Sequence, residues 1–197
     1  MFEGRAFQYQ KILFSIAAIY ESIPSRSTNA PALNDNFSQP DLSVFPRAFF
    51  DGAEQVGRCG CGVCIVVNEV CRFLLSWNGG RGSNSKAEAM ALAGLLQFCF
   101  FLDLRDVSIF GDSKVLVDAI CGKSCIRNPQ ISGWLERILF LWNRSIGVSI
   151  LHIKRDLNLV ADQLSKNGLS FDPGLWSLQV LFEDKVFSIQ DFSPLDF

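Results

Sequence analysis

The stretch AFFDGAEQVG, residues 48–57, contains an apolar run that ends abruptly in a carboxylate. The first three residues suit a buried strand, whereas Asp51 and Gly52 follow without any polar transition. A carboxylate at the end of a buried strand is costly unless it has a partner. The stretch therefore predicts a strand that leads into a polar site, where other residues of the chain would be the partners of Asp51.

Strand-like segments surround this stretch. VFPRAFF (44–50), GCGVCIVV (60–67) and CRFLLSW (71–77) are short apolar runs rich in β-branched and aromatic residues. Only a short connection separates the second run from the third, so these two are expected to form a hairpin. Two more strands are expected at DVSIFGD (106–112) and GVSILHI (147–153).

Helical segments alternate with the later strands. They are KAEAMALAGLLQFCFFL (86–102), SKVLVDAICG (113–122), ISGWLERILFLWNRS (131–145) and LNLVADQLSK (157–166). Ser83 or Ser85 would cap the first helix, and Gly122 would close the second. The order β-β-β-α-β-α-α-β-α predicts an α/β fold. Its mixed five-stranded sheet would have three antiparallel strands, then parallel strands, with helices flanking it.

Composition divides the chain into three regions. Residues 1–43 are expected to hold an N-terminal helix and a linker rich in Pro, Ser and Asn, residues 44–170 the folded domain, and residues 171–197 an acidic tail. The apolar run ILFSIAAIY (12–20) is too short for a bilayer, which needs about 20 residues. An amphipathic helix is preferred there over a signal peptide, because no small-residue cleavage site follows. No membrane partner is therefore expected.

Charge and cysteine content restrict the function further. The net charge of −2 argues against strong non-specific binding of nucleic acid, although residues 45–170 carry 14 basic and 11 acidic side chains. RCGCGVC (58–64) invites a zinc interpretation, but no second cysteine cluster follows at a suitable spacing, and His152 lies far along the chain. Small buried residues on a strand are the preferred interpretation. Unpaired cysteines would suit an intracellular location, in the nucleus or cytoplasm.

Four acidic residues lie in apolar surroundings: Asp51, Glu88, Asp112 and Asp162. Asp51 and Asp112 end strands that are expected to be neighbours, at the sheet edge where α/β proteins bind ligands. Four carboxylates at one corner would repel each other unless cations neutralised them, and an all-oxygen set suits Mg²⁺ or Mn²⁺. Each acid also has a structural explanation, as part of a turn, a helix start, a helix cap or a solvated surface.

Four stretches follow one another in the chain: FFDGA (49–53), GSNSKAEAMAL (82–92), FGDSKVLVDAI (110–120) and HIKRDLNLVADQLSK (152–166). In this order they resemble the sequence blocks of the type 1 ribonuclease H family. The resemblance is nearest to the ribonuclease H-like domain associated with plant non-LTR retroelement reverse transcriptases, and it covers about residues 44–170. It implies an RNase H-like fold and hydrolysis of the RNA strand of RNA/DNA hybrids with two divalent metal ions, Mg²⁺ or Mn²⁺.

The resemblance also implies roles for individual residues. Asp51, Glu88, Asp112 and Asp162 would bind the two ions, one activating a water and the other stabilising the departing 3′ oxygen. His152, ten residues before Asp162, matches the family's loop histidine, which assists proton transfer or product release. The alternative for His152 is a strand-end histidine that is hydrogen-bonded to the backbone.

A further set of residues would contact or position the substrate: Gly52, Ser83, Asn84, Ser85, Lys114 and Asn158. At the 83–85 turn the family contacts the minor groove of the hybrid, where 2′-hydroxyls and shape are recognised. Lys114 would meet a phosphate, and Asn158 would orient its loop. Arg81, Lys154 and Arg155 are candidate phosphate contacts, with a solvated surface as the alternative for each.

The sequence departs from the family in ways that weaken substrate binding. Glu54 adds negative charge near the expected metals, and the basic protrusion rich in Lys and Trp is missing, with Trp134 and Trp142 at core-like helical spacing instead. The protein is expected to be a monomer. Its affinity for hybrids would be weak unless another nucleic-acid-binding chain supplied a basic surface. The alternative function is a retroelement-derived, catalytically weak or inactive domain that binds nucleic acid or a partner. An unrelated hydrolase is disfavoured, because GxSxG and GxxxxGK[ST] motifs are absent.

Overall fold

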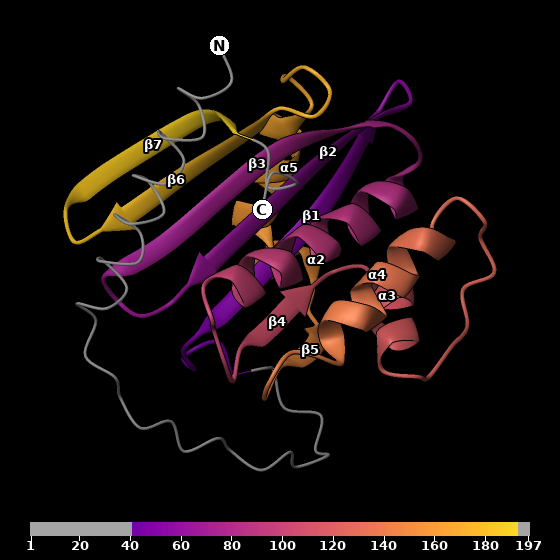
Figure 1. Cartoon of the computed structure of the whole chain (residues 1–197), viewed down its shortest axis with the longest axis horizontal. Helices are drawn as coiled ribbons and strands as arrows, with labels where there is room; N and C mark the ends of the chain where they lie inside the picture. Colours follow the sequence, from indigo (N-terminus) through magenta and orange to yellow (C-terminus); the bar gives the residue numbers. More distant parts are fainter. Residues whose placement is uncertain (1–40, 193–197) are drawn as a thin grey trace. The chain divides into compact units, whose positions relative to one another are not determined.

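A computed structural model of the chain describes residues 41–192, and side chains up to residue 188. The described residues form one seven-stranded sheet of order β5-β4-β1-β2-β3-β6-β7 (Figure 1). Its first five strands along the chain are β1 (Arg47–Gln55), β2 (Arg58–Val66), β3 (Cys71–Arg81), β4 (Ser108–Gly111) and β5 (Ser149–His152). The first three are antiparallel, whereas β4 runs parallel to β1 and β5 parallel to β4. The predicted mixed sheet is therefore confirmed.

Helices cover both faces of this sheet. They are α2 (Asn84–Phe101), α3 (Lys114–Ile120), α4 (Ser132–Trp142) and α5 (Leu159–Gly168), with a short 3-10 helix η1 (Arg155–Leu157) before α5. The helix α2 packs on β1 and β2 and supports α4, whereas α5 packs on the opposite face of β1, β2 and β3. The element order agrees with the sequence prediction. Within the described residues, no helix is both long and apolar enough to cross a membrane.

Successive residues of the cysteine-rich strand β2 point to opposite faces of the sheet, one covered by α2 and the other by α5. Cys59 and Cys61 face α2, where their thiols donate to carbonyls at the start of that helix at 3.6 and 3.5 Å. Gly60 and Gly62 face α5, and a Cβ atom on either would approach the backbone of Ser165 to 2.1 or 2.3 Å. All seven cysteines are free. The preferred interpretation of this stretch as small buried residues is confirmed.

The segment expected to be an acidic tail forms two further strands, β6 (Trp176–Phe182) and β7 (Lys185–Phe192). The strand β6 pairs with β3 and β7 pairs with β6, both antiparallel, so the sheet has two strands more than predicted. Leu178 and Val180 are buried opposite Leu75 and Phe73, which accounts for the apolar run LWSLQVLF. Two of the acidic residues of this segment, Glu183 and Asp184, lie in the turn that joins the two strands.

Trp77 and Trp176 join this hairpin to the rest of the sheet. Their rings stack at a centroid distance of 3.9 Å, on the face that α2 covers. Trp134 and Trp142 on α4, by contrast, are only half-buried. The expected N-terminal helix and most of the linker that follows it lie outside the described residues.

Candidate metal centre

Asp51 and Asp112 become neighbours through the register of two parallel strands. Phe50 on β1 lies opposite Gly111 on β4, so the next residue on each strand is an aspartate. The sequence predicted that Asp51 ends its strand, but β1 continues to Gln55 because it keeps pairing with β2. What ends beside Asp51 is β4. The aspartates therefore meet where β1 loses its parallel neighbour.

Glu88 reaches the same place from the other side of β1. Gly52 makes this approach feasible, because a Cβ atom there would lie 2.1 Å from the backbone nitrogen of Glu88. The N–H of Gly52 donates a hydrogen bond to the Glu88 carboxylate. Glu88 is only 6% exposed, and its buried Oε2 atom has no hydrogen-bond partner in the part of the chain that the structure describes.

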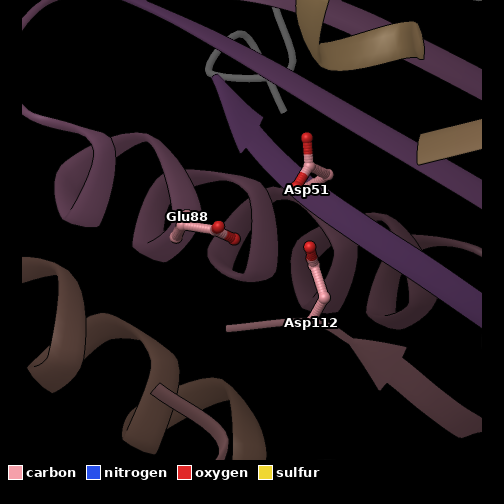
Figure 2. A group of neighbouring side chains, drawn as sticks. All are labelled: Asp51, Glu88 and Asp112. Atoms are coloured by element: carbon pink, nitrogen blue, oxygen red, sulfur yellow. The ribbon is translucent and has the colours of Figure 1, made fainter. Parts of the chain in front are cut away.

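The three carboxylates surround one small space (Figure 2). Asp51, Glu88 and Asp112 each offer an oxygen such that all three atoms lie within 4.8 Å of one another. Within residues 41–192, none of the three forms a salt bridge with a lysine or arginine. The set is all oxygen and carries an unpartnered buried acceptor, which fits a hard divalent cation.

Two of the clustered acids, Glu88 and Asp51, have raised pKa values. Burial raises the pKa of Glu88 to about 9, and the nearby charges of Asp51 and Asp112 act in the same direction. Burial also raises the pKa of Asp51 to about 6, against an opposing hydrogen bond from Ser165. A cation bound among these groups would favour their ionised forms. The cluster therefore has the electrostatics of a cation site.

Asp162 lies nearby on α5 but has different partners. Its Oδ1 accepts from Arg155 Nη2 at 2.7 Å and its Oδ2 accepts from Lys166 Nζ at 2.5 Å. Burial acts to raise the pKa of Asp162, but the hydrogen bonds from Lys166 and Arg155 outweigh it and the pKa is lowered. Asp162 is close enough to raise the pKa of Asp51 and is not among the three clustered acids. Its role as a fourth ligand stays a prediction.

Two neutral side chains hold the clustered aspartates. Asn158 is 1% exposed, and its Nδ2 donates to the Phe50 carbonyl at 2.9 Å and to Asp112 Oδ1 at 3.0 Å. It therefore ties the start of α5 to β1 and to Asp112, and its role in orienting the loop for substrate stays a prediction. Ser165 Oγ donates to Asp51 Oδ2 at 2.5 Å. The sequence analysis did not identify Ser165. The signal was a polar residue on the buried face of a short helix.

His152 and Lys114 lie beside the cluster. His152 ends β5, is exposed, and lies opposite Gly111 in the register. Lys114 Nζ pairs with Asp118 at 2.9 Å on α3. The hydrogen bond from Lys114 lowers the pKa of Asp118, and His152 adds a weaker electrostatic effect in the same direction. His152 is thus close to α3, and a phosphate would have to compete with Asp118 for Lys114.

The other predicted contact residues lie at the start of α2 and on the surface. Ser83 is the N-cap, and its side chain accepts from the Lys86 N–H at 3.4 Å, whereas Asn84 and Ser85 are exposed in the first turn. The exposed cationic candidates are Arg81, Lys154 and Arg155. Glu54 is exposed and accepts from the N–H of Gly57 at 2.5 Å, so it stabilises the β1–β2 turn.

Comparisons with known proteins agree with this architecture. The sequence model of a family described as reverse transcriptase-like matches residues 49–168. RNase H1 from the halophilic archaeon Halobacterium salinarum superposes with a TM-score of 0.58 and 25% identity, over 64% of this chain and 98% of that one. An RNase H1 isolated from compost, solved in complex with an RNA/DNA hybrid, gives 0.54 and 21%, over 62% and 95%.

A viral protein shares the fold as well. The foamy viral protease–reverse transcriptase, also solved with an RNA/DNA hybrid, gives a TM-score of 0.53 and 16% identity, over 76% of this chain and 22% of that one. No curated protein matches the chain. The structural matches confirm the predicted RNase H-like fold.

Proposed function

Because this chain belongs to the reverse transcriptase-like family, as its match over residues 49–168 establishes, we propose that it is a metal-dependent endonuclease. Its substrate would be the RNA strand of RNA/DNA hybrids. The proposal rests on one observation above all, the convergence of Asp51, Glu88 and Asp112 within 4.8 Å around a buried Glu88 oxygen that has no partner. The compost RNase H1 of the same fold, solved with a hybrid, supports the substrate class.

The cation site would use the clustered carboxylates directly. Asp51, Glu88 and Asp112 would hold Mg²⁺ or Mn²⁺, and Asp162 would join them for a second ion after exchanging its contacts with Arg155 and Lys166. Bound there, the metal would acidify a water molecule and stabilise charge on the scissile phosphate. The chain itself would supply fixed ligands, since Asp51 and Asp112 are already held by neutral hydrogen-bond donors.

The surrounding residues would bind the hybrid and move protons. His152 is exposed at the end of β5, which suits proton transfer or product release. The exposed Asn84 and Ser85 suit contacts with 2′-hydroxyls in a minor groove. Gly52 would act through packing, because it is buried against α2 and positions Glu88. Its direct contact with substrate stays a prediction.

A cleavage assay tests the proposal. The purified chain is incubated with a labelled RNA/DNA hybrid and Mg²⁺, beside the variants Asp51→Asn and Asp112→Asn. Each variant is expected to lose activity on the order of a thousandfold, since each removes a ligand charge. Asp103→Asn is the matched control, because Asp103 is exposed, pairs with the exposed Arg105, and has a positive φ that asparagine tolerates.

The assay has two clear negative results. Cleavage that persists unchanged in Asp51→Asn would identify a contaminating nuclease. A well-folded wild-type chain that cleaves no hybrid in Mg²⁺ or Mn²⁺ would reject the proposal.

The second candidate function is a catalytically weak or inactive retroelement-derived domain that binds nucleic acid or a partner. Two observations favour it: the modest basic excess of residues 45–170, and the pairing of Asp162 with Arg155 and Lys166. Hybrid binding that is unchanged by Mg²⁺, without turnover, would support this candidate. A second chain would then supply the basic surface to a monomer.

The origin and location of the chain belong to the same proposal. The family's description as reverse transcriptase-like supports descent from a retroelement. We also propose a plant source, because the four sequence blocks resemble those of plant retroelements. Seven free cysteines fit a reducing compartment such as the cytoplasm or nucleus.

A further inference from the structure

Ser165 is a fully buried hydroxyl that contacts the metal centre from α5. It is 0% exposed, and its Oγ lies 2.5 Å from Asp51 Oδ2 and 2.8 Å from the backbone carbonyl of Asp162. A serine hydroxyl has a single hydrogen, so it can donate fully to only one of these acceptors. An ionised carboxylate is the stronger acceptor, which assigns the hydrogen to Asp51.

The packing of β2 fixes Ser165 in this place. Asp51 pairs with Gly62, so both residues face α5, and Gly62 has no side chain to fill the space beside the carboxylate. A Cβ atom on Gly62 would lie 2.3 Å from the backbone nitrogen of Ser165. A Cβ atom on Gly60 would lie 2.1 Å from its carbonyl oxygen. The two glycines therefore let α5 approach until the hydroxyl reaches Asp51 across the neighbouring strand.

This contact affects how Asp51 presents its charge. Figure 2 shows one carboxylate oxygen of Asp51 directed away from Glu88 and Asp112. Ser165 holds one oxygen without neutralising the group, whereas Asp162 is held by two cationic side chains. A carboxylate fixed by a neutral donor keeps both its orientation and its charge available to a cation.

We propose that Ser165 is a positioning residue for the cation site, which holds one oxygen of Asp51 so that the other is presented to the metal. The inference rests on the proposed function, because it takes Asp51 as a cation ligand. A ligand that is already fixed loses little rotational freedom on binding, and this raises the affinity for the cation. Ser165 itself touches neither the cation nor the substrate.

Mn²⁺ binding to the full chain tests the proposal, measured by electron paramagnetic resonance and by calorimetry. Ser165→Ala is expected to weaken Mn²⁺ affinity about threefold to tenfold, the range for fixing one side chain. Ser76→Ala is the matched control, because Ser76 is a buried serine of β3 that pairs with Gly62 on the same face of the sheet. Its Mn²⁺ affinity is expected to equal that of the wild type. Thermal unfolding in EDTA compares the stability of the two variants.

Several outcomes would overturn the proposal. Equal Mn²⁺ affinity in the wild type and Ser165→Ala would do so. A similar fall in Mn²⁺ affinity in Ser165→Ala and Ser76→Ala, in proportion to their loss of stability, would also do so. If Ser165→Ala does not fold, Ser165→Cys keeps a similar volume with a weaker donor. An unchanged affinity in that variant would equally overturn it.

The same measurement separates this inference from the proposed enzyme. A wild-type chain that binds no Mn²⁺ would remove the cation site, and the role of Ser165 with it. A chain that binds Mn²⁺ but cleaves no hybrid would reject the nuclease, whereas the comparison of serine variants would still decide the role of Ser165.

Discussion

Glu88 has a folded-state pKa of about 9, against an ordinary value of 4.5. Between these two pH values the folded protein binds a proton that the unfolded chain has released. The free energy of unfolding therefore falls as the pH rises through this window in the absence of cations. A bound cation would favour the ionised form of Glu88. It would therefore counteract this fall in the free energy of unfolding.

This pH dependence gives the prediction at the residue scale. Glu88→Gln is expected to raise the free energy of unfolding by about 1–3 kcal/mol near pH 8 in EDTA, and by less near pH 5. The amide is neutral at every pH and can still accept the N–H of Gly52. Urea denaturation across this range measures the effect. Glu136→Gln on α4 is the control, because Glu136 is exposed. Superimposable pH profiles for Glu88→Gln and wild type would contradict the prediction.

The sequence identifies some of the site residues and not others, for a physical reason. Asp51, Glu88 and Asp112 stand out because a carboxylate in an apolar run is anomalous by itself. Ser165 does not, since a serine in a helix is ordinary, and its importance depends on a glycine of β2 that only the fold brings beside it. The pairing of Asp162 with Arg155 was equally hidden, because the two residues belong to different elements, α5 and η1.

At the scale of elements, β2 determines how closely α5 approaches the sheet. Gly60 and Gly62 face α5, whereas Cys59 and Cys61 face α2, so the two faces of one strand set two different packing distances. The contact at Gly62 is with backbone atoms of Ser165, which cannot rotate away. A side chain there must move the whole helix.

Gly62→Ala tests this packing. The added methyl group is expected to cost about 1–3 kcal/mol of unfolding free energy, because it overpacks a backbone contact. It should also weaken Mn²⁺ binding by moving Ser165 away from Asp51. Gly133→Ala is the control, since no atom lies within 4 Å of its Cβ position and alanine favours the helix. Chemical denaturation of both variants gives the comparison, and equal stability for the two would refute it.

Element boundaries were less predictable than element identities. The first strand was expected over 44–50 but extends over Arg47–Gln55, because the length of a strand depends on how far its partner continues. The β6–β7 hairpin was missed for a related reason. Its apolar residues are buried only when β6 pairs with β3, and that pairing is not encoded in the segment itself.

At the scale of the whole molecule, the hairpin is part of the same sheet as the metal centre. Leu178 is 2% exposed opposite Leu75 of β3, and Trp176 stacks on Trp77. The hairpin is therefore expected to unfold together with the domain.

Leu178→Ala tests whether the hairpin contributes to global stability. Removal of this buried side chain is expected to cost about 2–4 kcal/mol, in a single unfolding transition. Gln179→Ala, at an exposed position of the same strand, should cost less than about 0.5 kcal/mol. Thermal and urea unfolding monitored by tryptophan fluorescence provide the readout. If the β6–β7 hairpin did not contribute to the stability of the domain, Leu178→Ala would unfold with the same free energy as the wild type, which would contradict the prediction.

The strand order also has a consequence for biosynthesis. Asp51 and Asp112 are lateral neighbours only because β4 inserts beside β1 after the meander and α2 have been made. A ribosome-bound chain that ends before β4 has the first two carboxylates but no third to complete the cluster. Translation thus delivers the three carboxylates one at a time, and the acidic cluster is complete only after Asp112 has been added and β4 has paired with β1.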